Sequence, residues 1–66
     1  MPVQNRDLVR VGQRVRVVMK QDQRSGKLTE GFVERILTNS KHHPHGIKVM
    51  LQLGIVGRVQ EVVESN

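Results

Sequence analysis

The 66-residue chain has no cysteine, and this absence excludes disulfide bonds, thiolate metal sites and a cysteine nucleophile. Because cysteine-free chains are common in reducing compartments, we expect a cytoplasmic location. No apolar run approaches the roughly 20 residues of a membrane-spanning helix, and the first ten residues lack the apolar centre of a signal peptide. The sequence therefore predicts neither export nor insertion into a membrane.

Aromatic residues and alanine are almost missing as well. Phe32 is the single aromatic residue, which argues against base stacking on an aromatic platform and excludes an aromatic cage for methylated lysine. Phe32 lies in an apolar segment, so we expect it in the core. Alanine, the best helix former, is absent, whereas twelve of the 24 apolar residues are valine. Valine suits a pleated, half-buried surface, and this composition predicts mainly β structure.

Four segments show the patterns of strands: residues 14–19, 31–37, 47–53 and 55–63. In the first, Val15 and Val17 face inward and the two arginines face outward. The second has apolar residues on both faces, which favours a strand covered on both faces, and the third buries positions 47, 49, 51 and 53. Gly57 in the fourth segment indicates a bulge or a bend.

Polar segments separate these strands. Residues 20–29 form a loop, residues 43–46 (HPHG) fit a turn with proline second and glycine fourth, and residues 53–54 fit a tight hairpin. We therefore predict one all-β domain over residues 1–66, with flexible ends at 1–4 and 64–66. The fold class is a small SH3-like or KOW-like antiparallel barrel or half-barrel of four to five short strands, with a helical turn within residues 5–11.

The positive charge is concentrated in the first part of the chain. The net charge is +5, and residues 1–29 carry all of it, because the rest has equal numbers of basic and acidic residues. Such asymmetry favours a polyanion as partner, although a solvated surface has the same composition. The candidate binding residues are Arg14, Arg16, Lys20, Arg24 and Lys27, with Lys48 and Arg58 as weaker candidates.

Other motifs carry weaker signals. Backbone amides around Ser25 and Gly26 form a candidate anion-binding loop, although the glycine and the Ser or Thr of a Walker A motif are missing. His42, His43 and His45 crowd one turn, but their spacing does not aim the rings at one ion, so we expect no metal and no cofactor. No nucleophile elbow or close carboxylate pair is present, and we expect no enzymatic activity.

Four stretches in order, QRSGKLTEG (23–31), ILTNS (36–40), HPHGIKV (43–49) and VGRV (56–59), resemble the YwbE-like family of small bacterial proteins of unassigned function. The resemblance covers residues 12–62. The family pattern has an acidic residue before Gly54, where this chain has Leu53. Residues 12–17 and 31–36 are also similar to one hairpin of the KOW-type barrels of ribosomal proteins and transcription factors, which implies a role with RNA or protein.

The sequence thus favours a non-enzymatic module that binds RNA or another polyanion through its basic residues. The alternative is a protein-interaction module or a homodimer without a role in nucleic-acid binding, because a core this small leaves little stability of its own.

Overall fold

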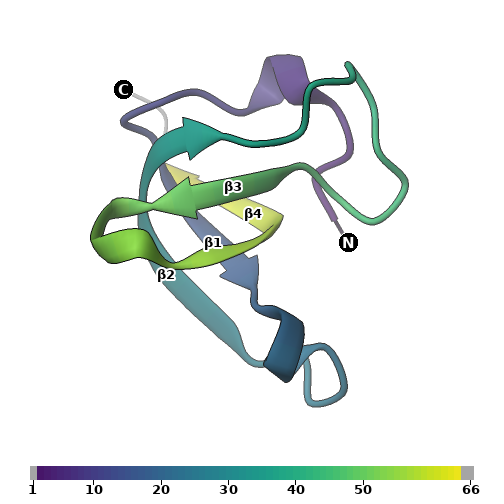
Figure 1. Ribbon diagram of the computed structural model, residues 1–66, viewed down its shortest axis with the longest axis vertical. Coiled ribbons are helices and arrows are strands. Elements are labelled where there is room, and N and C mark those ends of the chain that lie inside the picture. Colours follow the sequence, from purple (N-terminus) through teal and green to yellow (C-terminus); the bar gives the residue numbers. More distant parts are fainter. Residues whose placement is uncertain (1, 65–66) are drawn as a thin grey trace.

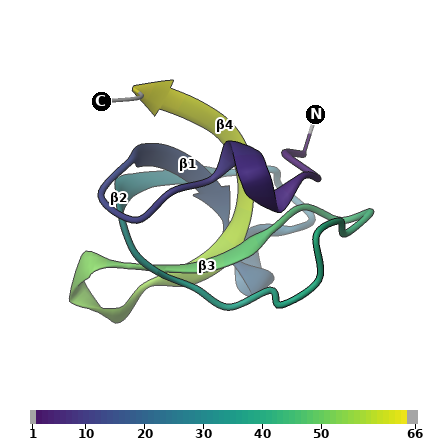
Figure 2. The same ribbon diagram turned by 90° about the horizontal axis from the view of Figure 1, so that it is seen from above.

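The computed structural model describes residues 2–64, and it shows four antiparallel strands closed into a barrel. The strands are β1 (Arg14–Val18), β2 (Leu28–Ile36), β3 (Lys48–Leu51) and β4 (Val56–Glu64), and the short 3₁₀ turns are η1 (Arg6–Leu8), η2 (Lys20–Asp22) and η3 (Gln52–Gly54). Each strand pairs with the next, and β4 pairs with β1 (Figure 1 and Figure 2). This arrangement confirms the predicted all-β, SH3-like barrel.

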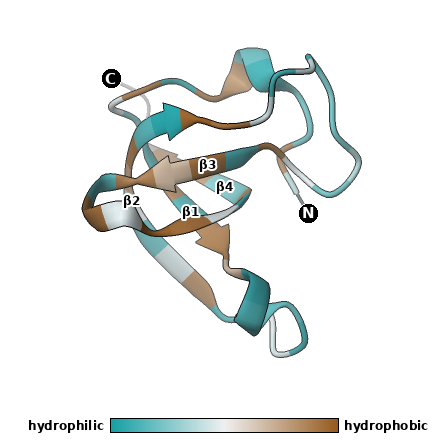
Figure 3. Cartoon of the chain, viewed as in Figure 1, coloured by the Kyte–Doolittle hydropathy of each residue, from teal (hydrophilic) through white to brown (hydrophobic). Residues whose placement is uncertain are grey.

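The interior is small and aliphatic. Alternation places Val15 and Val17 inside and the two arginines of β1 outside, as predicted. Valine fills most of the interior, and the strands in Figure 3 carry both hydrophobic and hydrophilic stretches. The buried hydrophobic residues are Val9, Val15, Val17, Val33, Ile47, Val49, Leu51 and Val59.

Strand β2 has one buried face, which corrects two expectations. Val33 is buried, whereas the Phe32 side chain is 43% exposed and lies outside the barrel. Successive residues point to opposite sides of a strand, so Val33 faces the interior and Phe32 faces outward, where it stays exposed. The prediction that Phe32 belongs to the core was therefore wrong, as was the prediction of a strand covered on both faces.

The β3–β4 hairpin also departs from the predicted pattern. Strand β3 ends at Leu51, and Leu53 is 97% exposed rather than buried. Leu53 has φ 74° and Gly54 has φ 81°, and the Leu51 amide donates to the Ile55 carbonyl at 2.7 Å. Two successive left-handed residues reverse the chain within a tight turn, which confirms the hairpin and turns the Leu53 side chain into solvent.

Gly57 serves close packing. The β3–β4 register is regular around it, and the irregular register lies instead between β1 and the later part of β4. A Cβ atom at position 57 would lie 2.7 Å from Val17 Cγ2 and 2.8 Å from the Val18 carbonyl oxygen. The absence of a side chain thus lets β4 approach β1, and the expected bulge at Gly57 is not found.

The N-terminal segment joins the barrel. Turn η1 lies within the predicted range, and the Asn5 side chain accepts a hydrogen bond from the Asp7 amide at 2.8 Å. Although residues 1–4 were expected to be flexible, Val3 donates to the Val59 carbonyl and accepts from the Ile47 amide, both at 2.9 Å. Positions 1, 65 and 66 of the predicted flexible ends lie outside the described residues.

The two longer connections, between β1 and β2 and between β2 and β3, lie outside the barrel. The β1–β2 connection projects from one end of the barrel as a lobe, and the connection at residues 37–47 runs along one side (Figure 1). The predicted turn at 43–46 is confirmed, since the Gly46 amide donates to the His43 carbonyl at 3.1 Å. Within residues 2–64 no helix is long and apolar enough to cross a membrane.

Candidate functional site

The two arginines of β1 lie on the outer face of the barrel, where carboxylates flank them. Arg16 pairs in register with Glu30 of β2 and Glu61 of β4. Its Nε lies 3.0 Å from Glu30 Oε1 and its Nη1 lies 2.9 Å from Glu61 Oε2. Arg16 donates both hydrogen bonds, and they raise the pKa of its guanidinium, the one to Glu61 contributing more than the one to Glu30. The charge of Arg16 is therefore firmly held, but two carboxylates offset its field.

Arg14 shares the same carboxylate. Its Nε lies 2.9 Å from Glu30 Oε2, and its guanidinium lies 5.6 Å from the centre of the Phe32 ring. Strand pairing thus brings acidic residues from beyond position 29, Glu30 and Glu61, beside β1. A count of charges along the sequence could not show this, because the local charge around each arginine depends on which residues of the neighbouring strands lie beside it.

A hollow of about 670 Å³, which we call the η2 groove, lies between η2, the end of β1 and the β3–β4 hairpin. Its apolar lining is Val18, Met19, Ile55 and Val56. The charged residues among those that line it are all cationic: Lys20, Lys48 and Arg58. This groove combines an apolar floor with positive charge and has no carboxylate among its lining residues.

The barrel itself brings the three cations together. Lys48 and Arg58 are direct cross-strand partners on β3 and β4, and Arg58 also pairs with Val18, two residues before Lys20. Like charges directly opposite one another on a sheet are destabilising, so this pair costs the fold some stability. The Arg58 side chain is held in place, because Nη1 donates to the Gly46 carbonyl at 3.2 Å. The Arg58 guanidinium is therefore fixed in place beside Lys48.

A second hollow of about 460 Å³, the His45 hollow, adjoins the first. It shares Val18, Gln23 and Arg58 with the η2 groove, and it adds His45 and Gln60 together with two prolines. Arg58 therefore stands between the two hollows and lines both.

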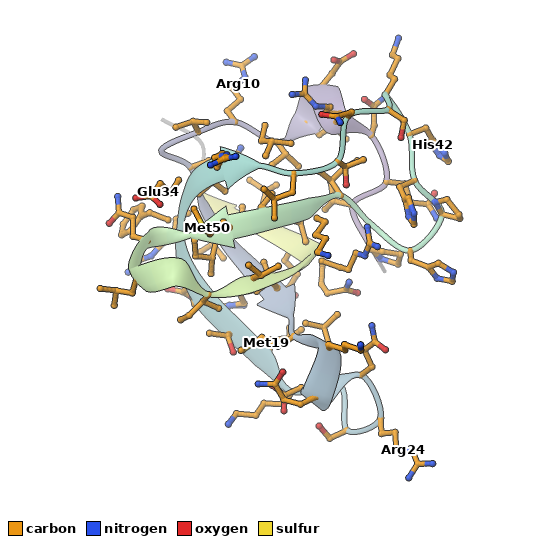
Figure 4. The ribbon with its side chains drawn as sticks, in the orientation of Figure 1. Arg10, Met19, Arg24, Glu34, His42 and Met50 are labelled. Carbon is orange, nitrogen blue, oxygen red and sulfur yellow. The ribbon has the colours of Figure 1, made fainter. Side chains whose placement is uncertain are left out.

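Arg24 and Lys27 belong to the projecting lobe and line neither hollow. Figure 4 shows Arg24 at the far end of this lobe, well away from the barrel. The lobe uses its polar groups internally: the Gly26 amide donates to the Asp22 carbonyl at 2.9 Å, and the Lys27 amide donates to Ser25 Oγ at 3.2 Å. The candidate anion-binding loop at Ser25 and Gly26 thus has two of its amides already engaged.

The three histidines lie on the connection between β2 and β3. The ring centres of His43 and His45 are 5.8 Å apart, and the His45 amide donates to His43 Nδ1 at 3.1 Å. Desolvation, followed by the positive charge of Arg58, lowers the pKa of His43. Among the described residues, no three His, Asp or Glu side chains are arranged to hold a metal ion.

The structure changes the order of the sequence-based candidates. Lys48 and Arg58, the weaker candidates by sequence, join Lys20 in one groove, whereas Arg14 and Arg16 pair with carboxylates. The apolar floor of the groove and the two glutamines near Arg58, Gln23 and Gln60, were not among the sequence-based candidates. The hairpin predicted at residues 53–54 implies that the positions on either side of it pair, but it does not indicate which other residues line the groove.

Comparison with known proteins supports the resemblance. Residues 2–62 match the model of a family described as "Uncharacterized conserved protein (DUF2196)". The chain is also 50% identical over 62 residues to "Uncharacterized protein YwbE" of Bacillus subtilis (strain 168), which covers 94% of this chain and 95% of that protein. No solved structure matches the chain significantly. With a family model matching nearly the whole domain and a relative identical at half of the aligned positions, the chain belongs to the YwbE-like family of small, uncharacterised bacterial proteins.

Proposed function

We propose that this protein is a non-enzymatic, cytoplasmic RNA-binding module whose binding site is the η2 groove. The observation that carries the proposal is the convergence of Lys20, Lys48 and Arg58 on a hollow without a carboxylate in its lining. Single-stranded RNA suits such a groove, because the phosphates of the RNA can contact the three cations while its sugars and bases cover the apolar floor. With no aromatic side chain in the lining, recognition is directed mainly at the backbone and has little sequence preference.

The salt dependence follows from the number of cations. Three phosphate contacts to single-stranded RNA give a slope of log affinity against log salt of about −2.1, at about −0.7 per contact. Between 50 and 200 mM salt the affinity should fall by a factor of about 20. Each groove cation that is removed should reduce the size of the slope by about 0.7.

The test is fluorescence anisotropy with a labelled 12-nucleotide RNA at several salt concentrations. The variant is Lys20→Gln with Lys48→Gln, since both lysines are exposed and their loss spares the barrel. The matched control is Arg10→Gln with Arg35→Gln, which removes the same charge from exposed residues that line neither hollow. Figure 4 shows Arg10 at the opposite end of the molecule from Arg24.

We expect the groove variant to lose about 1.4 from the slope and the control to keep it. Equal losses in the two variants would mean that overall charge, and not the groove, governs binding. An affinity that does not change with salt would refute the proposal, and single-stranded DNA of the same sequence shows whether the 2′-hydroxyl contributes.

A second candidate function is self-association, which the hairpin tip favours. Leu53 is 97% exposed, and an apolar side chain in that position offers a contact to a second copy. Sedimentation equilibrium decides this point: a single 7.5 kDa species at high micromolar concentration eliminates a homodimer. A dimer that Leu53→Ser disrupts would establish it.

A further inference from the structure

The His45 hollow continues the η2 groove beyond Arg58. The two hollows share Arg58, Val18 and Gln23, so a chain that leaves the groove past Arg58 enters the second hollow directly. There the available polar side chains are those of His45, Gln23 and Gln60. This continuity suits a linear ligand with several charges better than a single small anion.

The turn that carries His45 is rigidly placed. The His43–Gly46 hydrogen bond closes it, and Gly46 has φ 100° and would bring a Cβ atom within 3.0 Å of the Val59 carbonyl oxygen. The Gln4 side chain donates to the Pro44 carbonyl at 2.8 Å, which ties the turn to the N-terminal segment. His45 is therefore presented beside Arg58 without a cost of ordering the loop on binding.

The hydrogen bond within the turn gives the two imidazoles different roles. Because His43 Nδ1 accepts from the His45 amide at 3.1 Å, His43 is neutral, with its proton on Nε2. The ring of His45 is exposed and lines the hollow. Imidazole is the side chain that ordinarily changes charge between pH 5 and 8.

Among the residues that line the His45 hollow there is no acidic one. Arg58 faces the hollow from β4, His42 and His43 stand on the same connection, and η2 contributes no charge to the lining. No carboxylate lines the hollow, so no neighbouring group there stabilises an imidazolium until an anion arrives. A phosphate seated beside Arg58 supplies that negative charge and makes protonation of the ring favourable.

We propose that the His45 hollow is a second phosphate site, in which Arg58 and protonated His45 hold a phosphate of the strand that occupies the η2 groove. This inference rests on the proposed function and adds a property to it: binding takes up a proton. Because binding takes up one proton, the affinity for RNA should rise as the pH falls from 7.5 to 5.5 at constant salt, by at most about tenfold per pH unit.

The experiment measures binding of the same 12-nucleotide RNA at pH 5.5, 6.5 and 7.5 to the wild type, His45→Gln and His42→Gln. His42 is an exposed histidine on the same connection that lines neither hollow, and Figure 4 shows it on the outer side of the molecule. We expect His45→Gln to abolish the pH response and His42→Gln to keep it. Lys48→Gln should weaken binding by the same factor at each pH.

A direct readout accompanies the affinities. In a nitrogen-labelled sample the ring nitrogens of His45 should shift toward their protonated values when RNA is added at pH 7, whereas those of His42 should not. RNA binding without a pH response, or a response that survives His45→Gln, would overturn the second site and leave the η2 groove intact. No binding at any pH in low salt would instead overturn the proposed function itself.

Discussion

Leu53 offers a stability test that depends on backbone conformation alone. Its φ of 74° lies in the left-handed region, which costs a residue with a Cβ atom about 1–2 kcal/mol. Its side chain is 97% exposed, so truncating it sacrifices almost no packing. Asparagine tolerates this conformation, and glycine adopts it freely but loses about 0.5–1 kcal/mol through greater freedom in the unfolded chain.

Leu53→Asn and Leu53→Gly should therefore each stabilise the barrel, by about 0.5–1 kcal/mol. A gain of 1 kcal/mol raises the melting temperature of a domain of this size by about 4–8 °C. Because the chain has no tryptophan or tyrosine, far-ultraviolet circular dichroism is the appropriate signal for thermal and urea unfolding. The slope of the unfolding free energy against urea should not change, since the surface exposed on unfolding stays nearly the same.

Two controls isolate the cause. Leu53→Ala removes most of the exposed apolar surface but keeps the Cβ atom, so it should give no comparable gain. Leu8→Asn changes another exposed leucine, 61% exposed, that is not among the described residues with positive φ. If alanine at position 53 stabilises the protein as much as glycine does, the effect comes from removing an apolar side chain, and the argument from backbone strain is refuted.

Three further outcomes can be measured. Gly57→Ala forces a methyl group to 2.7 Å from Val17 and should cost about 1–3 kcal/mol of unfolding free energy by urea titration, and an unchanged midpoint would contradict the close approach of β4 to β1. Glu30→Gln breaks two exposed ion pairs, so it should change stability by at most about 1 kcal/mol, while RNA should bind more tightly because the net charge rises and only Glu61 still pairs with Arg16. The pKa of His43 is lower in the folded chain than in the unfolded chain, so on acidification the unfolded chain binds a proton at this histidine first. The free energy of unfolding, in the absence of RNA, should therefore fall as the pH drops through and below about 6.5, and thermal unfolding of His43→Gln should show a smaller fall.

Much of the fold could be predicted from the sequence, because alternation is a local signal. Val15 and Val17 are buried where the period of two places them, and proline and glycine mark the turn at 43–46. Phe32 and Leu53 were misplaced for different reasons. The closed barrel leaves β2 only one interior face, and the left-handed backbone of Leu53 turns its side chain outward where the alternation would have buried it.

The site was harder to predict, because charge compensation depends on which strands are neighbours. Arg16 looked available until β2 and β4 brought Glu30 and Glu61 beside it. Lys48 and Arg58 looked dispersed until the hairpin set them opposite each other. Both outcomes follow from strand register, which the residue types of a single strand do not reveal.

The pairing of β1 with β4 has a consequence for the dynamics of the molecule. Val18 pairs with Arg58, so the seam that closes the barrel joins segments separated by most of the chain, and we expect it to form late in folding. The η2 groove spans this seam, with Val18 and Lys20 on one side and Arg58 on the other. A single-stranded RNA bound across the seam should therefore stabilise the pairing of β1 with β4. Hydrogen exchange of the β1–β4 amides should then slow by the factor by which the bound form outnumbers the free form.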